Sequence, residues 1–232
     1  MNIAGLQKLT TSDFPGFLAC IVFLQGCNLK CPYCQNSSLI PMLQDDANNS
    51  LSENEFFEFL DKRKNILEGV VVSGGEPLVH QNVSNFISKI KSMGYKVKLD
   101  TNGINYLVLK ELLDAKLLDY IAMDIKNDFD NYSKTVGVPN IDTQSIQKSI
   151  DYIKSSNIDY EFRTTIVKEF HTLENISNIC EIVGKESKLF IQNFEDSSNV
   201  MNHELHGFDY EELENIQKHF EKDFPNFHVR GI

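Results

Sequence analysis

The chain alternates short runs of strand-forming residues with segments of helical periodicity, and this alternation constrains its fold more than any other feature. Six runs are rich in Val, Ile, Phe or Tyr, a composition typical of strands. They are Leu18–Leu24, Gly69–Ser73, Tyr95–Asp100, Tyr120–Asp124, Tyr160–Ile166 and Leu189–Phe194. The run Phe227–Val229 is a candidate for a final short strand.

Apolar residues recur with helical spacing between these runs. Ser52-Glu53-Asn54-Glu55 is a capping box that predicts the start of the first helix. The later stripes are Val83-Phe86-Ile87-Ile90, Leu109-Leu112-Leu113, Ile146-Ile150-Ile153, Ile176-Ile179-Cys180-Val183 and Leu213-Ile216-Phe220. Strand–helix–strand units favour parallel pairing with the helices outside the sheet. We therefore expect an α/β fold, a partial (β/α)6 barrel that resembles a TIM barrel but has too few strands to close.

Unusual residues follow each of the first four predicted strands, at Cys27–Gln35, Gly74–Pro77, Asp100–Gly103 and Asp124–Lys126. In parallel α/β folds the carboxyl ends of the strands share one mouth, where ligands bind. A series around one rim favours the barrel over the alternative, an open doubly wound sheet. Because we find no repeat, low-complexity tract or linker, we expect residues 1–232 to form a single domain.

Composition excludes several classes of function. The net charge is −11, from 22 basic and 33 acidic residues, whereas nucleic-acid binders carry a basic footprint. The longest basic run, Lys62-Arg63-Lys64, follows Asp61 and indicates a solvated helix face. No stretch approaches the length of a membrane helix, and the N-terminus lacks the pattern of a signal peptide. We expect a cytoplasmic protein whose five cysteines are reduced and available for metal binding or catalysis.

Cys27, Cys31 and Cys34 have the spacing C-x3-C-x2-C, directly after the first predicted strand. Cysteine thiolates are the usual ligands of iron–sulfur clusters, and three of them leave one iron of a four-iron cluster open for a small molecule. A structural zinc site is the alternative, but it needs four ligands. The two remaining cysteines, Cys20 and Cys180, lie in an apolar strand and on an apolar helix stripe. They are expected to be buried small hydrophobic residues.

This cysteine motif, with the aromatic Tyr33 before the third cysteine, resembles the signature of radical S-adenosylmethionine (SAM) enzymes. The resemblance covers most of the chain. Asp13-Phe14-Pro15-Gly16 and Val22-Phe23-Leu24-Gln25-Gly26-Cys27-Asn28 are similar to the N-terminus of activating enzymes for glycyl radical proteins. Within that group, the chain most resembles the activating proteins of anaerobic ribonucleoside-triphosphate reductase, and it is also similar to pyruvate formate-lyase activases.

The resemblance implies two cofactors: one [4Fe-4S] cluster on Cys27, Cys31 and Cys34, and SAM. Val72-Ser73-Gly74-Gly75-Glu76-Pro77 resembles the family's GGE motif, which holds the amino group of SAM. Glycines allow a ligand to approach the backbone and expose N–H donors, and Glu76 can accept from an ammonium group. Taken alone, two glycines after a strand indicate only a turn.

Further residues on later strands and on the cysteine loop complete the predicted SAM site. Asp100-Thr101-Asn102-Gly103 resembles the DTNG run of the activases, in which the aspartate shapes the SAM pocket, although an Asx turn is the alternative. Asp124 and Lys126 match a D-x-K run that contacts SAM, or form a strand-end ion pair. Arg163, a long cation in an apolar strand, needs a partner or a ligand. Gln35 and Asn102 complete the candidate cofactor contacts.

The chain departs from the pyruvate formate-lyase type at Gln192–Asp196, where a SAM-contacting histidine of that type is missing. The lone histidines His80, His171, His219 and His228 are interpreted as surface or structural residues.

The reaction that the resemblance implies is reductive cleavage of SAM to a 5′-deoxyadenosyl radical, which takes a hydrogen atom from a glycine of a partner enzyme. A flavodoxin- or ferredoxin-type protein would be the electron donor. An alternative is a radical SAM enzyme acting on a small molecule such as a deazapurine precursor. Those enzymes usually carry Q-G-E-G near the N-terminus, whereas this chain has Thr11–Gly16.

Overall fold

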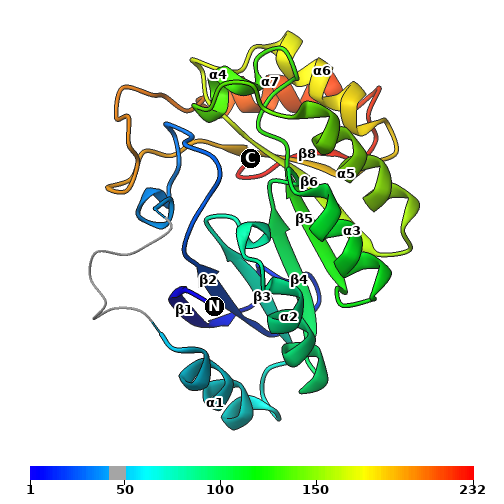
Figure 1. Cartoon of the computed structure of the whole chain (residues 1–232). Helices are drawn as coiled ribbons and strands as arrows, with labels where there is room; N and C mark the ends of the chain where they lie inside the picture. Colours follow the sequence, from blue (N-terminus) through cyan, green and yellow to red (C-terminus); the bar gives the residue numbers. More distant parts are fainter. Residues whose placement is uncertain (42–50) are drawn as a thin grey trace.

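The computed structural model describes residues 1–41 and 51–232. Its centre is one eight-stranded sheet in which the strands follow the order of the chain (Figure 1). Strand β1 pairs antiparallel with β2, and every later neighbour pairs parallel. The strands are β1 (Ile3–Thr10), β2 (Ala19–Leu24), β3 (Gly69–Gly74), β4 (Lys96–Thr101), β5 (Tyr120–Asp124), β6 (Asp159–Ile166), β7 (Leu189–Asn193) and β8 (Phe227–Val229).

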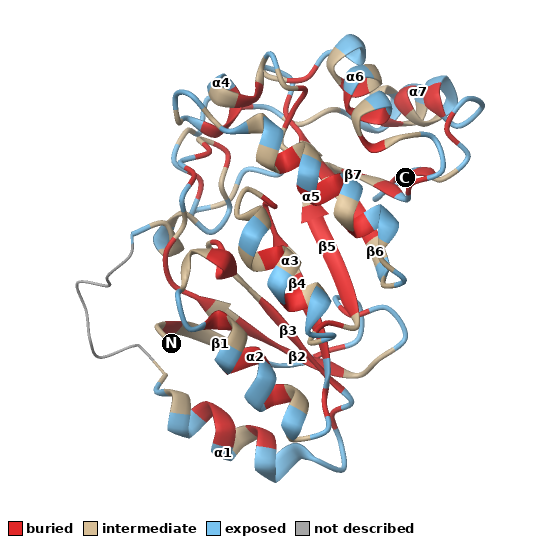
Figure 2. Ribbon diagram, turned by 45° about the vertical axis from the view of Figure 1, so that its right-hand side comes forward, coloured by how far each residue is buried: buried red, intermediate tan, exposed pale blue. Residues whose placement is uncertain are grey.

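Helices connect the parallel strands, and the first of them begins at the predicted capping box. They are α1 (Glu53–Arg63), α2 (Val83–Ser92), α3 (Tyr106–Asp114), α4 (Tyr132–Val136), α5 (Thr143–Ser155), α6 (Leu173–Val183) and α7 (Tyr210–Phe220). Ser52 and Thr172 form capping boxes with the third residues of α1 and α6, and the Asp142 side chain accepts from the N–H of Ser145 in α5. Each helix turns a buried side to the sheet and an exposed side outward (Figure 2).

The predicted partial α/β barrel is confirmed, with two strands beyond the six of the prediction. Strand β8 coincides with the candidate run, whereas the antiparallel strand β1 was not predicted. Residues 7–9 of β1 are exposed in succession, so the strand lacks the alternation or continuous burial by which a strand is recognised in a sequence. The sheet does not close, since β1 and β8 are its two ends and do not pair with each other in the described residues.

The two faces of the sheet bury different sets of side chains. Outward-facing residues such as Val70, Leu99 and Ile121 join the helices in one large core. On the inner face, Phe14 packs against Ile21 and neighbouring residues of β2, β3 and β5, and so fills the amino-terminal end of the barrel. The opposite, carboxyl-terminal end is the one left free for a site. No helix in the described residues is long and apolar enough to cross a membrane.

Candidate active site

A cavity of about 480 Å³ opens at the carboxyl ends of the parallel strands. All three motif cysteines line it, as do Tyr33, Gln35, Gly74, Gly75, Glu76, Asp100, Asn102, Asp124, Lys126 and Arg163. Every candidate residue from the sequence therefore faces one cavity. Cys20 and Cys180 do not line it, and both are fully buried as expected.

The cysteine loop is anchored on both sides by hydrogen bonds that leave its sulfur atoms facing the cavity. The N–H of Cys27 donates to the carbonyl of Ile40 over 3.1 Å, and the N–H of Lys30 donates to the carbonyl of Val136 over 3.0 Å. The fully buried Gln25 donates to the carbonyls of Ser38 and Pro41 at 3.0 and 2.8 Å. These contacts tie the entry of the loop to the segment that follows it, and the middle of the loop to the end of α4.

The three cysteines and Tyr33 fit an iron–sulfur cluster. Burial raises the pKa of the Cys27 thiol to about 12 and that of Cys31 to about 11, and a bound metal cation would oppose this effect by favouring the thiolates. The buried Tyr33 hydroxyl has no hydrogen-bond partner among the described residues. Cluster sulfur would supply the acceptor that this hydroxyl lacks.

The described residues contain no group of three Cys, His, Asp or Glu side chains placed to hold a single metal ion. A cubane does not require such a group, because each of its protein ligands binds a different iron atom. Three thiols on one loop facing one cavity are therefore compatible with the predicted cluster.

Gly74 and Gly75 are needed for contact between two chain segments. Gly74 has φ +126°, and a Cβ on either residue would overlap the backbone of Leu24 or Gly26. The N–H of Gly75 donates to the carbonyl of Leu24 over 2.9 Å, and the N–H of Glu76 donates to that of Gly26 over 2.8 Å. The expectation that this run exposes its N–H donors is therefore wrong for these two groups, because they hold the start of the cysteine loop.

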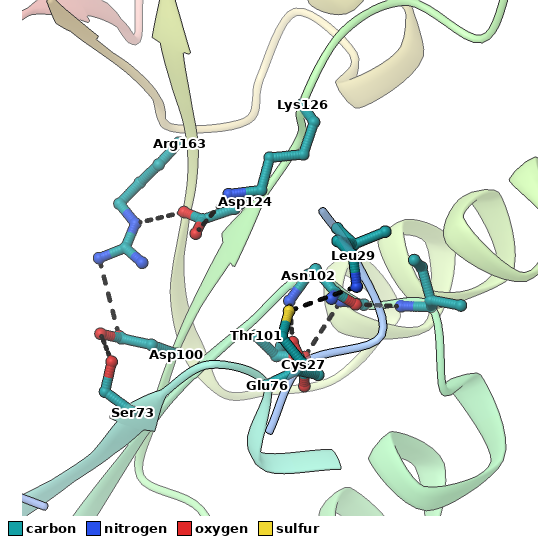
Figure 3. Close-up of polar contacts among 12 residues, drawn as sticks. Cys27, Leu29, Ser73, Glu76, Asp100, Thr101, Asn102, Asp124, Lys126 and Arg163 are labelled. Atoms are coloured by element: carbon teal, nitrogen blue, oxygen red, sulfur yellow. Dashed lines mark hydrogen bonds and ion pairs between the residues drawn. The ribbon is translucent and has the colours of Figure 1, made fainter. Parts of the chain in front are cut away.

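Glu76 joins the ends of β3 and β4. Its carboxylate accepts from the hydroxyl of Thr101 and the N–H of Asn102, both at 2.7 Å (Figure 3). It also accepts from the N–H of Leu78 at 3.0 Å. Burial raises the pKa of Glu76 to about 7, although these three donors oppose the shift. A carboxylate has about four acceptor positions, so one remains for a ligand. A ligand ammonium group there would favour the charged form.

Asn102 continues this connection to the cysteine loop. Its amide nitrogen donates to the side-chain oxygen of Asn28 over 2.8 Å, and its amide oxygen accepts from the N–H of Ile104. The second bond is the Asx-type turn considered from the sequence. Asn102 therefore both forms a local turn and contacts the segment between Cys27 and Cys31.

Charged side chains from three neighbouring strands alternate in sign along the inner wall of the barrel (Figure 3). Arg163, the register partner of Asp124, donates from Nε to its carboxylate over 2.8 Å, and its Nη1 lies 3.7 Å from Asp100. Lys126 lies 3.1 Å from the other oxygen of Asp124. Lys98 pairs with Asp100, which also accepts from the Ser73 hydroxyl at 3.1 Å.

This network keeps Asp124 and its two cations charged. Burial alone would raise the pKa of Asp124, but Arg163 and Lys126 outweigh that effect and hold its pKa far below the usual range. Burial likewise opposes the charge of Lys126, yet Asp124 raises the pKa of Lys126 above its usual value. The strand-end ion pair and the ligand-facing position of these residues are thus compatible, because the same side chains line the cavity.

Comparison with known proteins identifies the family of this site. Residues 21–183 match the sequence profile of the radical SAM superfamily, a range that contains every residue placed in the site so far. The chain belongs to the radical SAM superfamily.

Similar proteins narrow the position of this radical SAM enzyme within the superfamily. A Methanocaldococcus jannaschii protein, provisionally named a glycyl-radical enzyme activating enzyme, is 35% identical over 83% of this chain and 80% of its own length. The pyruvate formate-lyase-activating enzyme of Clostridium pasteurianum is 28% identical over 91% of this chain and 86% of its own. A 7-carboxy-7-deazaguanine synthase from Koribacter versatilis is 26% identical over 71% of this chain and 68% of its own length.

Solved structures show the same fold. The structure of anSMEcpe with bound AdoMet and a peptide superposes with a TM-score of 0.63 and 15% identity, covering 89% of this chain and 61% of that one. Membership of the superfamily implies a [4Fe-4S] cluster and SAM as cofactors. The partial barrel and the cavity at its carboxyl-terminal end are the parts of the fold that would receive them.

The structure adds residues to which the motifs of this radical SAM enzyme assign no role. Ser73 and Lys98 face the interior beside Asp100, and Thr165 and Gln192 line the cavity from β6 and β7. Period-two alternation could have indicated Ser73 and Lys98, because each lies two residues before a predicted site residue on the same strand face. Gln35 donates to the carbonyl of Glu195 over 3.0 Å, a contact across the barrel that no sequence signal indicates.

Proposed function

We propose that this radical SAM enzyme cleaves SAM reductively and installs a glycyl radical on a partner enzyme, namely anaerobic ribonucleotide reductase. The observation that carries the proposal is the open barrel, in which β1 and β8 do not pair in the described residues. An opening along the side of the barrel suits a protein loop that must bring a backbone Cα to the cavity. Similarity to activating enzymes supports the same class of reaction.

The N-terminal motif is connected to this cavity. Asp13, from the Asp13–Gly16 run that resembles activating enzymes, lines the same cavity as the three motif cysteines, on the wall formed with β1. Its neighbour Phe14 fills the amino-terminal end of the barrel. In the proposal, the motif closes the bottom of the cavity and presents a carboxylate toward the space that a substrate loop would enter.

The proposal gives each group of residues one task. Cys27, Cys31 and Cys34 hold the cluster, and Glu76 accepts from the amino group of SAM. Asp100, Asp124 and Lys126, together with Arg163, form the charged wall beside the methionyl part of SAM. The bound cofactors supply one-electron reductive cleavage of the sulfonium. The chain orients the reactants and excludes water, and a flavodoxin- or ferredoxin-type protein delivers the electron.

The test is an anaerobic mixture of reconstituted protein, reductant, SAM and candidate glycyl radical enzymes. We expect the EPR doublet of a glycyl radical with anaerobic ribonucleotide reductase from the same source. A matched control is the reductase with its radical-site glycine replaced by alanine, which should give no doublet. Formation of 5′-deoxyadenosine without a doublet in any candidate would contradict the activating function while leaving SAM cleavage intact.

Similarity to a 7-carboxy-7-deazaguanine synthase favours a second candidate, a small-molecule substrate such as a deazapurine precursor. The two candidates differ in what accelerates SAM cleavage. A deazapurine precursor that is consumed in step with 5′-deoxyadenosine formation, in the absence of any protein partner, would establish the second candidate instead of the first.

A further inference from the structure

His171 is a fully buried imidazole that belongs to none of the motifs of the site. It follows β6 and has a relative exposure of 2%. Its Nε2 lies 2.9 Å from the carbonyl oxygen of Lys126, and its Nδ1 lies 3.1 Å from the backbone nitrogen of Val167. The ring therefore bridges the end of β5, where Lys126 faces the cavity, to the end of β6.

The partners of the ring fix its protonation state and tautomer. The N–H of Val167 can only donate, so Nδ1 accepts, and the carbonyl of Lys126 can only accept, so Nε2 carries the hydrogen. The Val167 carbonyl also lies 3.3 Å from Nδ1, but it already accepts the N–H groups of Phe170 and His171, so it does not need a hydrogen on Nδ1. Burial lowers the pKa of His171, which is consistent with a neutral ring.

Lys126 is held at both of its backbone polar groups. Its carbonyl receives Nε2–H of His171, and its N–H donates to the hydroxyl of the fully buried Tyr132 over 3.3 Å. The next residue, Asn127, donates to the Thr135 hydroxyl and to the Phe170 carbonyl, both over 2.9 Å. The N–H of Ile125 still donates to a β6 carbonyl over 2.8 Å, and from Lys126 onward the backbone is held by these side chains.

The same segment supports the cysteine loop. Phe170 packs on Tyr33 with ring centroids 6.0 Å apart, and Val136 receives the N–H of Lys30. Phe170 is itself held by Asn127. A change in the position of residues 126–136 would therefore affect the ammonium group of Lys126 directly and the ring of Tyr33 through Phe170.

We propose that His171 is a positioning residue: its Nε2–H holds the main chain of Lys126 so that the ammonium group stays beside Asp124 in the SAM-facing wall of the cavity. The inference deepens the proposed function, because it assumes that SAM occupies this cavity. His171 does not touch the ligand and acts only through Lys126. Substituting this histidine by Gln or by Asn distinguishes its two hydrogen bonds.

His171→Gln and His171→Asn form a matched pair for the test. Counted along the side chain from Cβ, the amide nitrogen of Gln occupies the place of Nε2, whereas the amide oxygen of Asn occupies the place of Nδ1. The Gln variant keeps the donor to Lys126, and the Asn variant keeps only the acceptor for Val167. Both variants lack the ring, so both lose the same packing contribution of the imidazole.

The first measurement is SAM affinity of the reconstituted holoenzyme, by equilibrium titration. We expect His171→Asn to weaken SAM binding about fivefold, the factor set by one hydrogen bond, and His171→Gln to stay within about twofold of wild type. The rate of SAM cleavage at saturating SAM should change less than the affinity. Equal affinities in all three proteins, or equal losses in both variants, would overturn the positioning role.

The second measurement does not depend on SAM. Hydrogen–deuterium exchange of the reconstituted protein should be faster across residues 124–128 in His171→Asn than in His171→Gln. Equal exchange in the two variants would overturn the proposal. A wild-type protein that binds SAM but yields no glycyl radical would contradict the proposed function alone, whereas a wild-type protein that binds no SAM would overturn both.

Discussion

The two ends of the barrel interior are built from the same strands but carry different side chains. At the amino-terminal end, Phe14 packs against apolar residues such as Ile21 and Val71. Near the carboxyl-terminal end of the same inner face, Asp124 and Arg163 form part of a charged network that lines the cavity.

The difference shows how one sheet separates stability from chemistry. Side chains at positions i and i+2 share a face, so β3 presents Val71 to the packed end and Ser73 to the polar end. In parallel α/β barrels the carboxyl-terminal face carries catalysis and the opposite face carries stability. Substitutions at the two ends should therefore separate into losses of cofactor chemistry and losses of folding free energy.

The largest expected effect is at the cysteine loop. Cys34→Ala should abolish SAM cleavage, because it removes one of three thiolate ligands. Cys180→Ala is the matched control, since this buried cysteine lies on α6, away from the cavity. Iron content and 5′-deoxyadenosine formation after anaerobic reconstitution measure both variants. Retained cleavage in Cys34→Ala would refute its assignment as a ligand.

The second effect concerns the contact between β3 and the cysteine loop. Gly75→Ala places a Cβ against the carbonyl of Gly26, which is backbone and cannot rotate away. We expect iron incorporation to fall severalfold. In Gly5→Ala the new Cβ meets no atom closer than 3.9 Å, a side-chain carbon of Phe23, so this control should incorporate iron like wild type. Normal iron content in Gly75→Ala would show that the two segments separate without cost.

The third effect tests the packed end of the barrel. Phe14→Ala should lower the free energy of unfolding by about 3 kcal/mol, because it leaves a cavity among buried apolar side chains. SAM affinity should stay within about twofold of wild type at temperatures where the variant is folded. Denaturant unfolding and SAM titration measure the two quantities. A tenfold loss of affinity without loss of stability would place Phe14 in the binding site.

The smallest effect is a pH dependence of stability that arises from His171. The pKa of His171 is lowered in the folded protein, so below pH 6.5 the unfolded chain binds a proton that the folded chain does not. The free energy of unfolding therefore decreases as the pH is lowered. Between pH 7.5 and 5.5, wild type should lose up to about 1.4 kcal/mol more than His171→Gln, the linkage limit for one group one pH unit below its unfolded pKa. Unfolding at both pH values measures this, and identical losses would contradict a neutral buried ring.

The sequence predicted those parts of the molecule that depend on local pattern. Runs rich in Val, Ile, Phe or Tyr located the six central strands, the 3.6-residue period located the main helices, and short motifs located the cavity residues. Strand β1 was not predicted, because an edge strand is only half buried and its pattern is weak. The five-residue helix α4 is too short to show a period.

Contacts between distant segments could not be predicted from one sequence. Arg163 was recognised as a cation that needs a partner, but its partners Asp124 and Asp100 lie on other strands and emerge only from the register of the sheet. His171 was interpreted as a surface or structural histidine, and nothing in its neighbourhood indicates that it contacts Lys126. The need for glycine at position 75 arises from the backbone of Gly26.

The central claim is that the polar end of the barrel binds a cluster and SAM for reductive cleavage. The direct measurement is 5′-deoxyadenosine, quantified by chromatography after the reconstituted wild-type protein is reduced anaerobically with SAM. We predict its formation in wild type and its absence in Cys34→Ala. A wild-type protein with a full complement of iron and sulfide that forms no 5′-deoxyadenosine would contradict the claim.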